Sequence, residues 1–75
     1  MARKQVHVVY INELWQVKVF AEATARATYN IKSGAVAYGR VVAKSLAPSE
    51  LYIHKLDGAI GERETYGDDP YPPIG

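Results

Sequence analysis

The fold is decided by residues 5–19, QVHVVYINELWQVKV. On both sides of Asn12-Glu13, apolar and polar side chains alternate and β-branched residues dominate, which is typical of strands that bury one face. Asn12-Glu13 itself predicts a tight turn, although it lacks the glycine of the strongest turn signals. The stretch therefore predicts an antiparallel hairpin with Gln5 and His7 on its outer face. The inward side chains are Val6, Val8 and Tyr10 in the first strand, and Trp15, Val17 and Val19 in the second.

Residues 21–30 are ambiguous, because alanine and glutamate favour a helix but no larger apolar residue recurs there at helical spacing. A short strand, followed by one helix further along the chain, fits better. A strand near 26–29 would give the first hairpin the third neighbour that a stable sheet needs. The helix is expected at 33–47, with Ser33 as its N-cap and Pro48 ending it. Small and apolar residues recur there at helical spacing and form one stripe, which consists of Ala35, Gly39, Val42 and Leu46, with Val36 and Ala43 beside them.

A second hairpin completes the predicted sheet. Its strands, 51–56 and 60–66, flank Asp57-Gly58, a strong turn signal because glycine accepts positive φ. The last strand is polar on both faces apart from its ends, so we expect it at an edge of the sheet. The order β-β-(β)-α-β-β predicts an α+β fold, a single antiparallel sheet of four or five strands with one helix packed on one face.

The expected core lies between this helix and the sheet. Glycine costs about 1 kcal/mol in a helix relative to alanine. We therefore expect Gly39 to permit a close approach of the helix to a strand, for example over Trp15. The predicted core contains Val6, Val8, Trp15, Val17, Val19, Val42, Leu51 and Ile53.

Composition limits the classes of protein that the chain can belong to. Its 75 residues are 48% hydrophobic with a formal net charge of +1, which excludes a disordered acidic or basic chain. We expect one domain over 1–75 with an extended, proline-rich tail at 67–75. Because there is no cysteine, a disulfide framework and a thiolate zinc site are excluded. No apolar run has the length of a membrane span or a signal sequence, so we expect a cytoplasmic protein that does not bind membranes.

Charge is distributed unevenly along the chain. Residues 1–49 hold seven basic and two acidic side chains, a net charge of +5, whereas residues 50–75 hold two basic and six acidic ones, a net charge of −4. One interpretation is a basic surface for phosphate or an acidic partner. The other, which we favour because no more than two basic residues are adjacent, is that complementary charges meet in the fold or between subunits.

Much of the chain resembles one known family. Residues 51–60, LYIHKLDGAI, and 65–75, TYGDDPYPPIG, are similar to the signature of DUF2188, small bacterial and phage proteins of unknown function with a C-terminal TYGxDPxPP-like motif. His7-Val8-Val9 and the WQVK of 15–18 are similar to that family's opening elements. The resemblance implies that the chain shares the fold of this family and comes from a bacterium or a phage. Because the function of the family is unknown, the resemblance assigns no catalytic residues to this chain.

The chain also departs from this pattern. Asp68 stands where the family often has asparagine, and Lys55-Leu56 replaces a Gly-Lys pair. Residues 21–34 lack the acid-rich helix start of relatives.

The C-terminal segment is the most distinctive stretch. In one interpretation Tyr66 and Tyr71 pack onto the sheet while the prolines restrict the unfolded chain. In the other, the segment is a rigid recognition element for a partner, because polyproline-like segments bind with little ordering cost. The candidate partner-binding residues are Tyr66, Asp68, Asp69, Pro70, Tyr71, Pro72 and Pro73.

Residues with catalytic or metal-binding chemistry are few. His7 and His54 fall on predicted strands, and they could approach each other if those strands are neighbours. Two nitrogens alone make a poor metal site, and Asp57 or Glu62 would have to complete it. The chain has no cysteine, and Ser33, Ser45 and Ser49 have no histidine beside them in sequence. We therefore expect no metal, no cofactor, no catalytic residue and no enzymatic activity.

A protein-binding module, concerned with host regulation or defence, is the function that we expect. Six tyrosines in a short chain favour an interface, because tyrosine combines buried area with a hydroxyl. We also expect a homodimer in which the +5 portion of one chain meets the −4 portion of the other, with strand 6–10 at an edge that the 66–75 tail covers or exchanges.

The alternative is binding of nucleic acid by the basic N-terminal two-thirds of the chain. Exposed Trp15, Tyr29 and Tyr38 would stack on bases while cations contact phosphates. Against it, Trp15 is expected in the core and the acidic tail would repel a phosphate backbone. The cations concerned are Arg3, Lys4, Lys18, Arg26, Lys32, Arg40 and Lys44.

Overall fold

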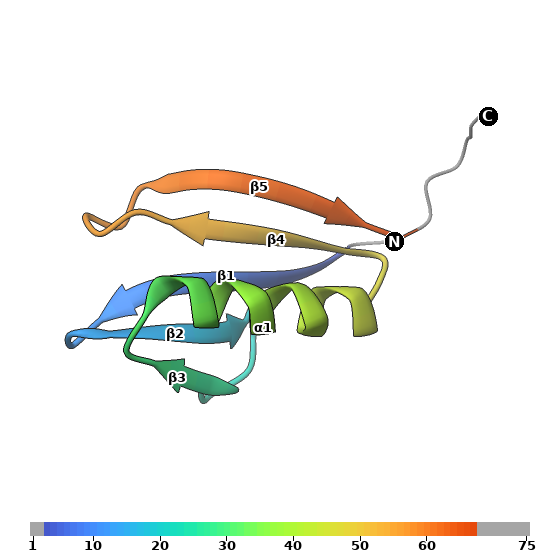
Figure 1. Ribbon diagram of the computed structural model, residues 1–75. Helices are drawn as coiled ribbons and strands as arrows, with labels where there is room; N and C mark the ends of the chain where they lie inside the picture. Colours follow the sequence, from blue (N-terminus) through green and yellow to red (C-terminus); the bar gives the residue numbers. More distant parts are fainter. Residues whose placement is uncertain (1–2, 68–75) are drawn as a thin grey trace.

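The computed structural model describes residues 3–67, which form one five-stranded sheet and one helix on it (Figure 1). The predicted α+β fold is confirmed, including the short third strand. In chain order the elements are β1 (Lys4–Ile11), β2 (Leu14–Val19), β3 (Ala27–Tyr29), α1 (Lys32–Ser45), β4 (Ser49–His54) and β5 (Ile60–Tyr66).

The strands lie in the order β3-β2-β1-β4-β5. Three of the four pairings are antiparallel, as expected, but β1 and β4 are parallel. The reason is the helical connection, because α1 runs back along the sheet and β4 then starts at the same end as β1 (Figure 1). The prediction that strand 6–10 lies at an edge is therefore wrong, since β1 is the central strand and the edges are β3 and β5.

The turn between β1 and β2 is tight, as predicted. Asn12 and Glu13 both have positive φ, at 54° and 67°, which is the geometry of a two-residue hairpin loop that follows the twist of the strands. Beside the turn Tyr10 pairs with Trp15, and their ring centroids are 4.9 Å apart. Tyr10, expected to point into the core, is 38% exposed, because it lies beside the turn at the end of the sheet, where its ring contacts the buried indole of Trp15.

The helix begins one residue earlier than predicted and ends two residues earlier. The prediction of Ser33 as N-cap is wrong, because the cap residue is Ile31 and Ser33 lies within the first turn. The main-chain carbonyl of Ile31 accepts the first helical hydrogen bonds, from the amides of Gly34 and Ala35. The cap therefore comes from backbone geometry, without a side-chain hydrogen bond.

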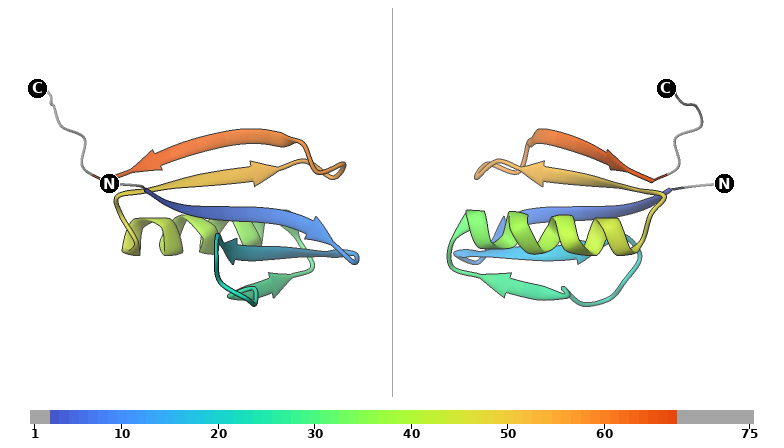
Figure 2. Two further views of the ribbon diagram at one scale, coloured as in Figure 1. Left: turned by 180° about the vertical axis from the view of Figure 1, so that it is seen from behind. Right: turned by 45° about the vertical axis from the view of Figure 1, so that its right-hand side comes forward.

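All eight residues of the predicted core are buried, and Ala35 and Ala43 of α1 join them. Gly39 allows the expected close approach, but over Val8 and Leu51 of the central strands rather than over Trp15. A Cβ at Gly39 would lie 2.9 Å from Val8 Cγ2 and 3.3 Å from Leu51 Cδ1. The helix thus sits across the middle of the sheet and covers one of its faces (Figure 2).

Candidate functional site

The second face of the sheet is not covered by any element that residues 3–67 form (Figure 2). We call it the open face. It carries the strand residues that alternate with the core, among them His7 and Val9 of β1, Lys18 of β2 and Tyr52 of β4. An uncovered sheet face of this kind is a candidate binding surface.

One row of side chains crosses four strands of the open face. Lys18, His7, Tyr52 and Arg63 are successive partners in the register of β2, β1, β4 and β5. In its centre, the rings of His7 and Tyr52 stack with centroids 4.8 Å apart and planes inclined by 16°. The Tyr52 hydroxyl donates a hydrogen bond to the carboxylate of Glu50, which raises the pKa of Tyr52 above its usual range. The row therefore presents two flat rings between two cations.

The two histidines meet on this face, because β1 and β4 are neighbours. His7 Nδ1 lies 2.9 Å from His54 Nε2, and each outer ring nitrogen has a carbonyl oxygen near it. His54 Nδ1 is 2.9 Å from the main-chain oxygen of Gly58, and His7 Nε2 is 3.4 Å from Gln5 Oε1. Burial, together with the charge that His54 can carry, lowers the pKa of His7.

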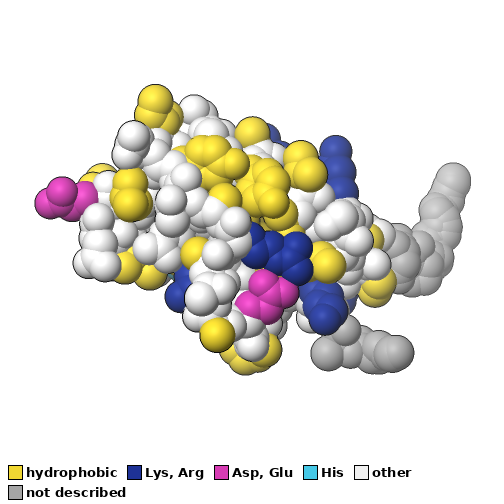
Figure 3. All heavy atoms as spheres, turned by 90° about the horizontal axis from the view of Figure 1, so that it is seen from below, with side chains coloured by type: hydrophobic (Ala, Val, Ile, Leu, Met, Phe, Trp, Pro, Cys, Tyr) yellow, Lys and Arg dark blue, Asp and Glu magenta, His cyan; other side chains and the backbone are white. Residues whose placement is uncertain are grey.

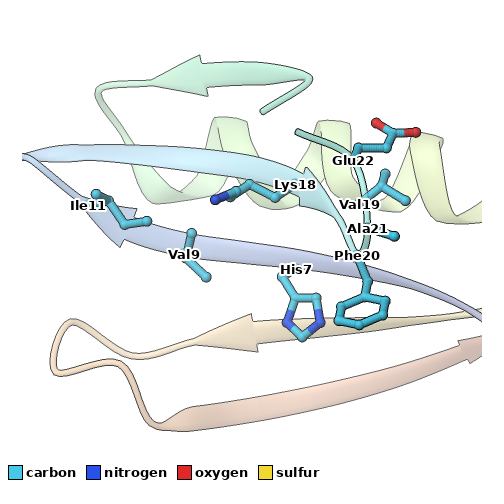
Figure 4. Close-up of a pocket in the computed structure, with 8 residues that line it drawn as sticks. All are labelled: His7, Val9, Ile11, Lys18, Val19, Phe20, Ala21 and Glu22. Atoms are coloured by element: carbon cyan, nitrogen blue, oxygen red, sulfur yellow. The ribbon is translucent and has the colours of Figure 1, made fainter. Parts of the chain in front are cut away.

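Beside the histidines the open face is hollowed (Figure 4). The hollow has a volume of about 290 Å³, and the residues that follow β2 contribute to its lining. Among them, Phe20 is 69% exposed, while its backbone amide is fixed by a 2.9 Å hydrogen bond to the oxygen of Gln5. An aromatic ring is thus held in solvent by an ordered backbone. The lining residues are His7, Val9, Ile11, Lys18, Val19, Phe20, Ala21 and Glu22.

The chain was compared with known protein families, curated proteins and solved structures. A family model described as an uncharacterized protein conserved in bacteria, DUF2188, matches residues 6–66. The chain belongs to the DUF2188 family. The match runs from β1 through β5, so it includes the helix, both histidines and the hollow, and it confirms the resemblance noted in the sequence. No curated protein and no solved structure is significantly similar to the chain.

The seven basic residues of the nucleic-acid hypothesis do not share one surface of this DUF2188 fold. Only Lys18 lines the hollow of the open face. Lys32 lies over the indole of Trp15, 5.2 Å from the ring centroid, and Lys4 and Lys44 lie at the ends of β1 and α1. Seen from the β3 side, Lys and Arg atoms form separate groups among apolar and polar ones (Figure 3).

The three arginines of that set have acidic partners. Nitrogen and oxygen are 2.8 Å apart in both Arg26–Glu22 and Arg40–Glu64, and 3.9 Å apart in Arg3–Glu50. The last two pairs join the basic first portion of the chain to the acidic second portion. Complementary charges therefore meet within the fold, which is one form of the interpretation that we favoured.

The aromatic residues of the same hypothesis support the core. Trp15 is 6% exposed, and Tyr29 and Tyr38 are partly buried against the core, with their ring centroids 6.2 Å apart. Tyr66, from the candidate partner-binding segment, also packs against the core, and its main-chain oxygen accepts a hydrogen bond from Arg3. The other six residues of that segment, Asp68, Asp69, Pro70, Tyr71, Pro72 and Pro73, lie outside the described residues.

The two residues that were to complete a metal site have other surroundings in the fold. Asp57 accepts a hydrogen bond from the amide of Ala59 in the β4–β5 turn. Glu62 lines a separate hollow, between α1 and the β4–β5 hairpin. Within residues 3–67, no group of three or more His, Cys, Asp or Glu side chains is placed to bind one ion.

The hydroxyl groups of two serines are used by the fold. Ser49 is buried and donates to the main-chain oxygen of Ala43, and Ser45 donates to that of Val42. The third serine, Ser33, is exposed in the first turn of α1. The histidines bond to each other instead of to a serine.

Sequence reasoning missed the hollow and its exposed ring. Val9 and Ile11 occupy the outward positions of β1, and Phe20 follows the last inward residue of β2. Apolar residues at outward strand positions were the available signal, because an ordinary solvated face would carry polar side chains there. Within residues 3–67 no helix has the length and hydrophobicity of a membrane span.

Proposed function

We propose that this DUF2188 protein is a non-enzymatic binding module of the bacterial cytoplasm that holds another protein on its open face. The observation that carries the proposal is the hollow on the open face, which has the exposed ring of Phe20 among its lining residues. Host regulation or defence stays the expected setting. The partner would bind to a surface, the open face, that is already ordered in this chain.

The chemistry of the hollow selects the kind of partner. Val9, Ile11 and Phe20 give it apolar walls, and burying one large apolar side chain there would contribute about 1.5–3 kcal/mol. Lys18 stands at the same hollow, whereas the nearby Glu22 is paired with Arg26. A protein that presents a large apolar side chain next to a carboxylate therefore complements the site in shape and charge.

Binding suits the site better than catalysis for a chemical reason. A nucleophile needs a base within hydrogen-bonding reach, held in place by a third group. Here the two imidazoles are engaged with each other, and the hydroxyls of Ser45 and Ser49 donate to helix carbonyls. These contacts support a site that recognises a surface rather than one that activates a substrate.

The test is affinity capture with the full chain and with two variants, each changed at one side chain of nearly the same exposed fraction. Phe20 is 69% exposed and Leu56, in the β4–β5 turn, is 68% exposed, so serine at either position should leave the core intact. We expect a stoichiometric protein that is captured by the unchanged chain and by Leu56→Ser, and that binds Phe20→Ser at least about tenfold more weakly.

Capture that is equal for both serine variants would contradict the proposed site. Two controls accompany the capture. The captured protein must bind the purified chain directly, and circular dichroism must show that both variants are folded. An apolar contact also predicts weak salt dependence, because few counterions are released when it forms.

One observation favours nucleic acid as a second candidate. The row of Lys18, His7, Tyr52 and Arg63 places two stacked rings between two cations, which is the layout of a base-stacking platform. The carboxylate of Glu50 beside Tyr52 opposes it, because it would face the phosphates. A steep fall of affinity for single-stranded DNA or RNA with salt, weakened by Tyr52→Ala, would favour this candidate over a protein partner.

A further inference from the structure

The segment that follows β5 carries the chemistry that the hollow of the open face selects. Residues 68–75, DDPYPPIG, lie outside the described residues, and their sequence places Tyr71 two positions after Asp69. A large ring next to a carboxylate complements a hollow that has apolar walls and Lys18 in its lining. The chain thus contains a segment that matches its own binding surface.

The strand β5 ends at the same end of the sheet as Phe20. Tyr66 pairs with Ser49, which in turn pairs with Lys4 at the start of β1. The amide of Phe20 donates to the oxygen of Gln5, the next residue of β1. The chain therefore leaves the sheet close to the row of residues that contains Phe20.

The segment is long enough to reach the hollow. The hollow lies over β1 and β2, which are two and three places away from β5 in the strand order (Figure 4). At about 4.8 Å between neighbouring strands, this distance is about 10–14 Å. The five residues from Tyr66 to Tyr71 span up to about 16 Å. The ring of Tyr71 can therefore reach Val9, Ile11 and Phe20 without any change in the sheet.

Cations stand at both ends of this path. Arg3 Nη1 donates a 3.2 Å hydrogen bond to the main-chain oxygen of Tyr66, so its guanidinium lies where the segment begins. Glu50 shares this guanidinium only loosely, at 3.9 Å. At the other end Lys18 lines the hollow, and within residues 3–67 it has no acidic partner. The acidic start of the segment, at 68–69, therefore complements the charge along the path.

We propose that residues 68–73 fold back onto the open face of the same chain and place the ring of Tyr71 in the hollow beside Phe20. Pro70, Pro72 and Pro73 lower the cost of ordering the segment, because proline restricts the chain before it docks. The docked segment occupies the surface that a protein partner needs, so the partner must displace it. This regulation rests on the proposed function, whereas the docking itself does not.

The test of docking is NMR spectroscopy of the isotope-labelled full chain. We expect nuclear Overhauser effects between the ring of Tyr71 and the methyl groups of Val9 and Ile11. Tyr71→Ser should shift the amide signals of Val9, Ile11 and Phe20, whereas the matched control Ile74→Ser, beyond the docked residues, should leave them in place. Absence of these Overhauser effects, or shifts confined to residues 68–75, would overturn the proposal.

A mixture of labelled and unlabelled chains identifies which chain supplies the segment. Overhauser effects that cross between chains would place the segment on a second copy and overturn the fold-back within one chain.

The regulation is tested separately, with the captured partner. A segment that fills the hollow at least half of the time weakens binding at least about twofold, so Tyr71→Ser should bind the partner at least about twofold more tightly. Equal affinities would refute the regulation. Docking seen in a chain that captures no partner would refute the proposed function and support the fold-back.

Discussion

At the level of single residues, His7 makes the stability of the fold depend on pH. Burial and its neighbour His54 lower the pKa of His7 below its ordinary value of 6.5. The unfolded chain therefore takes up a proton at a pH at which the folded chain does not. The stabilisation is complete above about pH 6.5 and is lost as the pH falls toward the pKa of the folded state.

We predict that the free energy of unfolding is lower at about pH 5.5 than at about pH 7.5. Urea denaturation in a buffer with a metal chelator measures the difference. In His7→Gln the difference should shrink, because glutamine does not titrate. An identical pH dependence in the variant would show that other groups cause it.

Gly39 is the second residue whose role is specific. Alanine would favour the helix by about 1 kcal/mol, but its Cβ would lie 2.9 Å from Val8 Cγ2, closer than such atoms pack. We predict that Gly39→Ala lowers the free energy of unfolding by about 1 kcal/mol net. Val41→Ala, at an exposed position of the same helix, should change it by less than about 0.5 kcal/mol. A stabilised Gly39→Ala protein would contradict this account of the close approach.

At the level of elements, the β1–β2 turn contains a residue in a costly conformation. Glu13 has φ of 67°, a region in which side chains other than glycine, asparagine and aspartate are strained by about 1–2 kcal/mol. We predict that Glu13→Gly stabilises the fold by about 1 kcal/mol in thermal or urea denaturation. Glu62→Gly, the same change within β5, should destabilise it. Equal effects of the two changes would rule out turn strain as the cause.

The elements also show what the sequence could predict. Alternation in 5–19 predicts both strands and their buried faces, because a side-chain period of two leaves no other choice. The parallel pairing of β1 with β4 could not be read in the same way, because it depends on where a helix returns the chain. For the site, the sequence identified His7 and His54 and predicted their approach only if their strands are neighbours, a condition that the strand order decides. The role of Phe20 depends on the open face, for which the only sequence signal was the pair of apolar residues Val9 and Ile11 at outward positions of β1.

At the level of the whole molecule, the edges of the sheet are the places at which a second copy of the chain can pair with it. β3 and β5 each have one unpaired side within the described residues, although Glu62, Arg63 and Glu64 place charges on β5. The homodimer expected from the sequence stays a prediction. Its electrostatic basis is weaker, because Arg40 of the basic portion pairs with Glu64 of the acidic portion in the same chain. Light scattering at tens of micromolar protein should give twice the monomer mass. A monomer mass would refute the dimer, and an unchanged dimer after truncation behind Tyr66 would exclude a role of the tail.

The central claim is that the open face, and not the helix face, binds a protein partner. The most direct measurement is NMR chemical-shift mapping of the labelled chain as the captured partner is added. We predict that the largest shifts fall at His7, Val9, Ile11, Lys18 and Phe20, while exposed positions of α1 such as Ala37 and Val41 stay unchanged. Shifts confined to α1 or to β5, with the hollow unaffected, would contradict the claim.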